Sequence, residues 1–284
     1  MNAKDTTVLV LPSMIMMTQA HIVLRKEIQK WLPRRRPDDN KSAGGRVLIL
    51  AGSDMMPGAA MLAAKAASRC GAGYIYIIEK QVLNFMPEAI LWNGKDLYQF
   101  DAVLVGPGLG ISKKTAALIQ RLKKSRSPVV IDADALTVAA AKKMYPFPTN
   151  WIATPHESEL SRFFKIEPTL IRKKRLQFCK QGQSLLGCTI LLKGRGSLIS
   201  NSTKTALVPT GNVALAKGGS GDVLAGMIAA FIAQGLSPEK AAILACWIHG
   251  DTADQWIKDG KDELSFSPSD LLDSLPLALA RLRK

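Results

Sequence analysis

Six short apolar runs recur along the chain with stretches of helical pattern between them, and this alternation constrains the fold more than any other feature. The runs are uninterrupted, partly β-branched and three to five residues long: 47–51, 74–78, 102–105, 129–132, 151–153 and 189–192. Such runs are typical of parallel strands buried on both faces. Repeated strand–helix units predict an α/β fold, with a mainly parallel central sheet flanked by helices on both faces.

The stretches between the runs favour helices, and one pair of later segments favours a hairpin. Helices are expected at residues 59–70, 114–124, 170–183, 222–234 and 238–258. Residues 197–201 and 206–208 predict the two strands of a hairpin, with its turn at 201–204.

The length of 284 residues allows one large domain, which is expected over residues 46–284. Residues 1–45 are interpreted as a leader, with a helix around residues 19–31, that packs on this domain. Apolar residues 8–17 lack the small-residue cleavage site of a secretory signal. The longest uncharged apolar stretch, residues 223–233, is far shorter than the ~20 residues of a membrane span and predicts a buried helix. No membrane association is therefore expected.

Composition argues against several other classes of protein. The four cysteines are dispersed and lack metal-ligand spacing, which disfavours a zinc site or a disulfide framework and favours reduced thiols in a cytoplasmic protein. The net charge of +15 is spread over separate basic runs, and aromatic residues make up only 6% of the chain. Nucleic-acid binding requires a basic face with interleaved aromatics, so no nucleic-acid partner is expected. A basic surface of this kind suits phosphorylated small molecules.

The segment at residues 211–226 carries the strongest chemical signal, because a glycine-rich turn opens directly into a long apolar helix. The backbone N–H groups of such a turn can approach an anion closely, and the positive end of the helix points at the same place. The N–H groups that form this candidate anion hole belong to Gly218, Gly219, Ser220 and Gly221. Asp222 follows at the mouth of the helix, either as an N-cap or as a functional carboxylate, and the local pattern leaves both open.

The sequence around this turn resembles two related families. Gly-Gly-Ser-Gly-Asp at the start of a helix resembles the anion-hole motif of ribokinase-like kinases. The longer segment at residues 210–226 is similar to that of the NAD(P)H-hydrate dehydratases, and the resemblance extends over residues 40–275. It implies a ribokinase-like single domain in which Asp222 is the general base and contacts the substrate.

Turns after the early strands match the same family. Residues 51–60 follow the first strand and residues 106–110 follow the third. The resemblance implies that Ala59 and Gly108 bind the hydrated nicotinamide nucleotide. On sequence alone, each of these turns could equally be a plain strand–helix connection.

Residues 154–160 resemble the family pattern Thr-Pro-His-Pro-Gly-Glu. The resemblance implies that His156 touches the substrate and that Glu159 lies near the metal ion. Glu157 and Ser158 replace the family's Pro and Gly, which adds a negative charge near the phosphates and leaves the shape of this loop in question.

Two further groups follow strand ends. Asp132 and Asp134 could orient substrate, hold Mg²⁺ or merely cap the next helix. The positive charge of a lysine next to a glycine turn can bind the phosphate groups of a nucleotide. The resemblance places the adenine nucleotide at this turn and at Gly221; the residues of the turn are Lys193, Gly194, Arg195, Gly196 and Ser197. His249 is expected to be structural, and His21 carries no signal.

The resemblance implies an enzyme that uses ADP or ATP, with Mg²⁺, to phosphorylate the ring hydroxyl of hydrated NADH or NADPH (NADHX or NADPHX). Elimination of phosphate then restores the cofactor, so the enzyme is a hydro-lyase of cofactor repair. A homo-oligomer such as a tetramer is implied, together with a separate epimerase, for which residues 1–45 leave no room. The preference between ADP and ATP stays open.

Two alternatives compete with this interpretation. The first is a ribokinase-like kinase acting on a hydroxyethylthiazole- or pyridoxine-like compound, which would stop at the phosphorylated product. The second is a catalytically silent nucleotide-binding regulator, against which the presence of Asp222 argues. For the dehydratase, we expect the turns at the strand ends to gather at one edge of the sheet, with the two ligands on opposite sides of the 218–222 turn.

Overall fold

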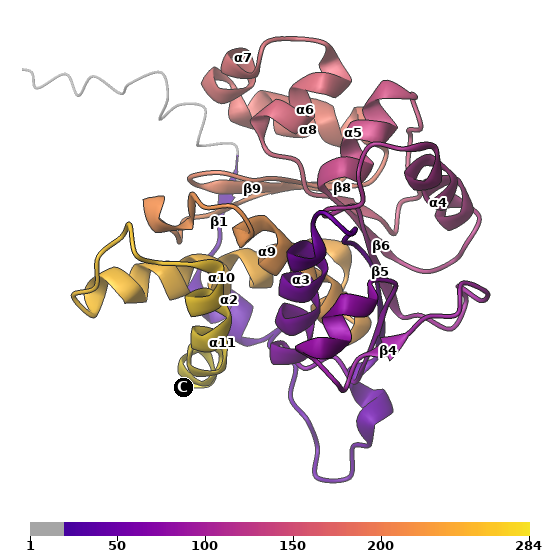
Figure 1. Cartoon of the computed structure of the whole chain (residues 1–284). Coiled ribbons are helices and arrows are strands. Elements are labelled where there is room, and N and C mark those ends of the chain that lie inside the picture. Colours follow the sequence, from indigo (N-terminus) through magenta and orange to yellow (C-terminus); the bar gives the residue numbers. More distant parts are fainter. Residues whose placement is uncertain (1–19) are drawn as a thin grey trace, which may run out of the picture.

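One continuous sheet runs through the part of the chain that the structure, a computed structural model, describes, which is residues 20–284 (Figure 1). Its ten strands lie in the order β1-β10-β9-β8-β7-β6-β5-β2-β3-β4. All neighbouring pairs are parallel except the two that involve β9. The strands are β1 (His21–Ile22), β2 (Arg46–Leu50), β3 (Tyr74–Ile77), β4 (Ile90–Leu91), β5 (Ala102–Val105), β6 (Val129–Ile131), β7 (Ile152–Ala153), β8 (Thr189–Leu192), β9 (Ser197–Ser200) and β10 (Thr205–Val208).

Helices cover both faces of this sheet, as expected for buried parallel strands. The α-helices are α2 (Arg25–Gln29), α3 (Pro57–Arg69), α4 (Lys113–Lys123), α5 (Ala133–Ala141), α6 (Glu157–Phe164), α7 (Pro168–Lys173), α8 (Arg175–Leu186), α9 (Ser220–Ala233), α10 (Pro238–Lys258) and α11 (Pro268–Arg283). Short 3₁₀ helices are η1 (Lys41–Gly44), η2 (Lys80–Asn84) and η3 (Val213–Leu215). The predicted fold class and all six predicted strands are confirmed.

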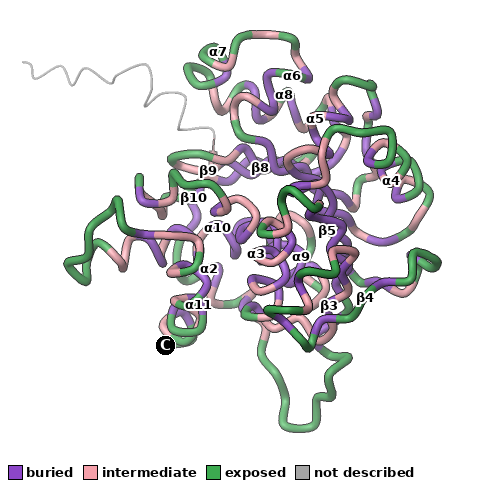
Figure 2. The backbone as a smooth tube through the Cα atoms, viewed as in Figure 1, coloured by how far each residue is buried: buried purple, intermediate pink, exposed green. Residues whose placement is uncertain are grey.

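The alternation of side chains along β2 explains why two apolar cores form. Val47 and Ile49 belong to the core under α3, α9 and α10, whereas Leu48 and Leu50 belong to the core under α4, α5 and α8. Successive side chains of a strand point to opposite faces, so an uninterrupted apolar run supplies both cores. Figure 2 shows the buried strands at the centre and exposed residues on the outer loops.

The central helix α9 confirms the prediction of a buried helix at residues 223–233. It packs against α3, α10 and the strands β2 and β5, and its side chains from Val223 to Ile232 are buried. Within residues 20–284, no helix is both long and apolar enough to cross a membrane. The four cysteines are free and buried.

The helix expected around residues 19–31 is wrong in its first part. His21 and Ile22 form β1, which pairs with β10, and α2 begins only at Arg25. A free edge on β10 is available to this segment, and pairing with it overrides local helical preference. Residues 1–19, which include the apolar residues 8–17, lie outside the described part, and the division into 1–45 and 46–284 stays a prediction.

The helix expected over residues 170–183 is divided in two. Lys174 has an extended φ of −131° between α7 and α8, so the helix is interrupted there. The interruption places Arg175 at the first position of α8, where its side chain reaches the turn between β8 and β9. A helical period in the sequence does not reveal a single residue at which the helix axis changes direction.

A candidate active site at the carboxyl ends of the strands

The turns that follow five strands are joined to one another by backbone hydrogen bonds. Gly52 N, after β2, donates to Pro107 O, after β5, at 2.8 Å. Thr154 N, after β7, donates to Ile131 O at the end of β6, at 3.1 Å. Lys193 N, after β8, donates to Pro155 O at 2.9 Å. The carboxyl ends of these parallel strands thus form one edge, which is where ligands bind in open α/β sheets.

Two predicted substrate positions lie against each other at this edge. Gly108 has a φ of +65°, and a Cβ added to it would lie 3.0 Å from the Cβ of Ala59 and 3.1 Å from Met56. Glycine is therefore required, both for its left-handed conformation and for the close approach of the 106–110 turn to the start of α3. The structure brings Ala59 and Gly108 together, and their contact with substrate stays a prediction.

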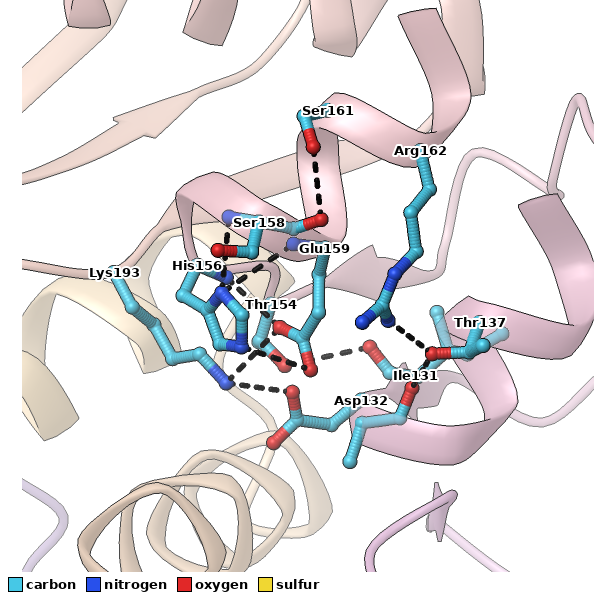
Figure 3. A network of polar contacts seen from close by, with 11 residues as sticks. Ile131, Asp132, Thr137, Thr154, His156, Ser158, Glu159, Ser161, Arg162 and Lys193 are labelled. Atoms are coloured by element: carbon cyan, nitrogen blue, oxygen red, sulfur yellow. Dashed lines mark hydrogen bonds and ion pairs between the residues drawn. The ribbon is translucent and has the colours of Figure 1, made fainter. Parts of the chain in front are cut away.

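His156 and Glu159 form a capping box at the start of α6 (Figure 3). His156 Nδ1 accepts from the backbone N–H groups of Ser158 and Glu159, at 3.1 and 3.3 Å. Glu159 Oε2 accepts from His156 N at 2.9 Å. The His156 side chain is 48% exposed, and its Nε2 lies 3.6 Å from Glu159 Oε1. His156 therefore has the structural role considered from the sequence, and its contact with substrate stays a prediction.

The replacement of Pro and Gly by Glu157 and Ser158 leaves this helix start intact. Ser158 takes part in the capping box through its N–H group. The Glu157 carboxylate accepts a hydrogen bond from Arg175, a residue that sequence reasoning missed. The added negative charge is therefore paired within the protein.

Lys193 is the centre of a buried charged cluster (Figure 3). Its Nζ lies 2.7 Å from Asp132 Oδ1 and 3.7 Å from Glu159 Oε2, and Asp132 is almost fully buried. Burial lowers the pKa of Lys193, but the attraction of Asp132 and Glu159 outweighs burial and raises it above its ordinary value. Lys193 is thus charged, and its ammonium also faces Gly221, whose added Cβ would lie 3.7 Å from Nζ.

Asp222 is the third residue of α9, and the N-cap interpretation is wrong. Gly219 is the N-cap, with a left-handed φ of +95° that lets the chain turn into the helix. Burial raises the pKa of Asp222, the charges of Asp132, Asp134 and Glu159 also raise it, Lys193 lowers it, and the resulting pKa is about 7. A carboxyl group that titrates near neutrality at such an edge suits general-base chemistry.

The two aspartates after β6 have different partners. Asp134 Oδ2 accepts from Gly110 N at 2.8 Å and so holds the 106–110 turn. Asp132 pairs with Lys193, and although it occupies the N-cap position of α5, its side chain makes no cap hydrogen bond. The capping alternative is therefore wrong for Asp132, whose carboxylate faces the site.

A cavity of about 670 Å³ lies beside Lys193 and Gly221, within the 300–1,000 Å³ usual for ligand pockets. Five of the six residues predicted to bind nucleotide are among those that line it: Lys193, Gly194, Arg195, Ser197 and Gly221. As far as the described chain goes, Ala59, Gly108, His156 and Asp222 do not line this cavity. The two predicted sets of ligand residues thus have different surroundings.

Two residues of α10 contribute to this cavity or its loops. Asp254 accepts from Gly211 N and Asn212 Nδ2, both at 2.9 Å, and so holds the loop before the glycine turn. His249 Nε2 lies 3.0 Å from Ser220 O, and burial lowers the pKa of its ring to about 4. His249 is therefore neutral and donates to that carbonyl from the cavity wall. No local pattern signals Asp254, because its partners lie more than forty residues away.

A preformed metal centre is absent from residues 20–284, where no three His, Cys, Asp or Glu side chains are grouped to hold an ion. Glu159 Oε2 already accepts from His156 N and faces Lys193. Mg²⁺ is commonly bound through one or two carboxylates together with substrate phosphates. The donor set fits an ion that arrives with a nucleotide, and Glu159 as its ligand stays a prediction.

Comparison with known proteins identifies the family. The family model described as NAD(P)H-hydrate dehydratase matches residues 47–277. The ADP-dependent (S)-NAD(P)H-hydrate dehydratase of Bacillus subtilis is 33% identical over 268 residues, which cover 88% of this chain and 95% of that protein. The crystal structure of the Bacillus subtilis ADP/ATP-dependent enzyme with ATP/Mg²⁺ matches with a TM-score of 0.85 and 31% identity, over 93% of this chain and 99% of that one.

A longer relative matches this chain over only part of its own length. The bifunctional NAD(P)H-hydrate repair enzyme of Vibrio cholerae is 34% identical over 235 residues, which cover 78% of this chain and 47% of that protein. The chain thus spans about half the length of that bifunctional relative. The family match, the extent of the Bacillus subtilis similarity and the shared fold lead to one conclusion: this chain belongs to the NAD(P)H-hydrate dehydratase family.

Proposed function

We propose that this chain is a hydro-lyase that uses an adenine nucleotide to dehydrate NADHX and NADPHX and so restore NADH and NADPH. The observation that carries the proposal is the position of Asp222. It lies in the first turn of α9 next to Gly221, which lines the cavity, and its pKa is raised to about 7. Family membership and the name of the Bacillus subtilis relative support the same reaction.

The reaction begins when Asp222 accepts the proton of the ring hydroxyl as its oxygen attacks the terminal phosphorus of the nucleotide. The backbone N–H groups of the 218–221 turn and the start of α9 stabilise the charge that develops on the phosphoryl oxygens. Lys193 adds a positive charge at the same place. The bond from the transferred phosphorus to the bridging oxygen breaks, and the shortened nucleotide leaves. The carbon–oxygen bond of the phosphorylated ring then breaks to release inorganic phosphate, and loss of a proton from the neighbouring ring carbon re-forms the carbon–carbon double bond of the reduced nicotinamide.

The substrate and the nucleotide occupy different surroundings in this proposal. The hydrated nicotinamide lies on the side of Ala59, Gly108 and His156, and the nucleotide occupies the cavity that Lys193 and Gly221 border. The 218–222 turn separates the two, because in-line transfer brings acceptor and donor to phosphorus from opposite directions. When bound with the nucleotide, Mg²⁺ would neutralise phosphate charge, with Glu159 as the candidate protein ligand.

Three features complete the proposal. Either ADP or ATP is proposed as the phosphoryl donor, since the relative crystallised with ATP/Mg²⁺ is named ADP/ATP-dependent. The protein is proposed to work in the cytoplasm as a homo-oligomer such as a tetramer. A separate epimerase is proposed to interconvert the two forms of its substrate, since the bifunctional relatives are about twice as long as the matched region.

Product analysis tests the proposal. The protein is incubated with chemically hydrated NADH and either ADP or ATP, and the returning absorbance of reduced nicotinamide and the release of inorganic phosphate are followed together. Equal amounts of restored cofactor and phosphate are expected, and Asp222→Asn serves as the control. A stable phosphorylated product would identify a small-molecule kinase instead, and nucleotide binding without any product would identify a silent regulator.

A further inference from the structure

The guanidinium group of Arg175 holds the turn between β8 and β9. Arg175 Nη1 donates to Lys193 O at 3.2 Å. Arg175 Nη2 donates to Leu192 O at 3.2 Å and to Gly196 O at 3.4 Å. Three carbonyl groups of one tight turn thus converge on the planar, five-donor group best suited to such an arrangement.

The turn is shaped to receive this group. Gly194 has a φ of +133°, and a Cβ added to it would lie 2.6 Å from Arg175 Nη1. Any side chain at this position would therefore displace the guanidinium or open the turn. Gly194 and its neighbours Arg195 and Ser197 line the 670 Å³ cavity, so the shape of the turn is also the shape of the cavity wall.

The counter-charge of Arg175 lies at the start of α6. Its Nη1 also donates to Glu157 Oε1, and the two side chains are only 17% and 19% exposed. Glu157 is the first residue of α6 and directly follows His156. Arg175 therefore connects the turn that carries Lys193 with the helix start that carries His156 and Glu159.

Because the Arg175–Glu157 ion pair is largely buried, loss of either side chain is costly. Removing one partner of such a pair leaves the other charge without compensation, which is strongly unfavourable. Loss of Arg175 would also leave three carbonyl groups without their charged donor, and bonds from charged donors are stronger than neutral ones. The turn would then lose its defined position relative to Lys193 and Gly221.

We propose that Arg175 is a positioning residue for nucleotide binding, with Glu157 as its counter-charge. It acts through the 193–197 turn and touches neither ligand. The inference rests on the proposed function only in assigning the cavity to an adenine nucleotide. Because Arg175 holds the cavity wall, its loss weakens nucleotide binding more than binding of the hydrated cofactor.

Direct binding measurements on the full chain test this proposal. The dissociation constant of ADP is measured by calorimetry, and the KM values of ADP and hydrated NADH are measured separately. For Arg175→Met, the ADP dissociation constant is expected to rise by at least about tenfold, since several charge-assisted bonds to the turn are lost. The KM of hydrated NADH is expected to change by less than about threefold, because the backbone bonds of the substrate-side turns remain.

Two further variants separate charge from geometry. Arg175→Lys keeps the positive charge but lacks the planar guanidinium group with its several donors. Its ADP affinity is expected to lie between those of Arg175→Met and wild type. Glu157→Gln is expected to weaken ADP binding by about threefold or more, and to add little in the Arg175→Met background, because the two side chains act as a unit. Arg281→Met is the matched control: Arg281 is part-exposed, pairs with Asp251 at 3.4 Å and lies on α11 outside the cavity.

The outcomes distinguish the inference from the proposed function. Unchanged ADP binding in folded Arg175→Met, or equal weakening of both ligands, overturns the role of Arg175. If Arg175→Met fails to fold, the proposal is tested with Arg175→Lys and Glu157→Gln. It is overturned if these two variants bind ADP as tightly as the control Arg281→Met does. Wild-type protein that binds ADP but restores no cofactor contradicts the proposed function alone. Wild-type protein that binds neither ADP nor ATP contradicts both.

Discussion

The two sides of the 218–222 turn differ in how their polar groups are occupied. On the proposed substrate side, the groups already bind one another: Asp132 holds Lys193, and Glu159 closes the capping box with His156. On the nucleotide side, a cavity of about 670 Å³ is bordered by glycines and backbone groups, with Lys193 at its edge. The first side is a preorganised cluster of charged groups, and the second is a cavity bordered mainly by backbone groups.

The difference suggests separate roles: the charged cluster tunes the proposed catalytic base, and the cavity recognises the nucleotide. Burial, together with the charges of the nearby carboxylates, raises the pKa of Asp222 to about 7, which a solvent-exposed aspartate would not reach. A cavity lined by glycine turns recognises its ligand through shape and backbone donors, so single side chains there have smaller effects. Lys193 belongs to both sides, so substitutions of Lys193 and of its neighbours show where one side ends.

The largest effect is expected for Asp222→Asn. The substitution preserves shape but removes the proton acceptor, so kcat should fall by about 10²–10⁴-fold, the range for loss of a general base. Binding of ADP, measured by calorimetry, should stay within about threefold of wild type, because Asp222 does not line the cavity. Near-normal turnover in this variant would end the assignment of Asp222 as the base.

The pH dependence of turnover is expected to report the same group. Asp222 must be ionised to accept a proton, and its pKa is raised to about 7. The value of kcat should therefore rise as the pH increases through about 7, with roughly a tenfold loss for each pH unit below it. The measurement is a kcat profile at saturating nucleotide. A flat profile from about pH 5 to pH 8 would show that the base is a carboxyl group with an ordinary pKa.

A smaller effect, divided between stability and binding, is expected for Lys193→Ala. The KM for nucleotide should rise by about tenfold, since a charged contact to phosphate is lost, and more than the KM for hydrated NADH. Stability should fall by about 3–5 kcal/mol because Asp132 and Glu159 lose their counter-charge.

The double variant Lys193→Ala/Asp132→Asn separates these two losses. It should regain part of the stability, measured by urea unfolding, but none of the nucleotide affinity. If Lys193→Ala raised the KM values of nucleotide and hydrated NADH equally, Lys193 would not belong specifically to the nucleotide site.

The smallest effect is expected for Gly221→Ala. The added methyl group would lie 3.7 Å from Lys193 Nζ, an ordinary contact, at the border of the cavity. Nucleotide affinity should fall by only about threefold, while helix propensity stabilises the protein by up to ~1 kcal/mol. Gly58→Ala, in the first turn of α3 with open space around it, is the matched control and should leave the nucleotide KM unchanged. A large loss of turnover in Gly221→Ala would place the reacting phosphoryl group against Gly221 itself.

The sequence by itself determined the sheet and the location of the site. Apolar runs such as residues 47–51 are long enough to be recognised as strands, and their burial on both faces requires helices on both sides. The glycine turn at residues 218–221 was equally predictable, because its chemistry depends on neighbouring residues in one short segment. Because neighbouring strands of this part of the sheet are parallel, the turns that follow them lie at one edge.

Only the tertiary structure decided the pairing of β1 with β10, the interruption at Lys174 and the roles of Arg175 and Asp254. It also decided that Asp132 binds Lys193, sixty-one residues away along the chain, and that the pKa of Asp222 is raised. Each of these depends on contacts between segments distant in sequence, and local patterns carry information only about neighbours within a few residues. Burial and mutual charge are properties of the packed molecule, so the chemistry of this edge arises where several chain segments meet.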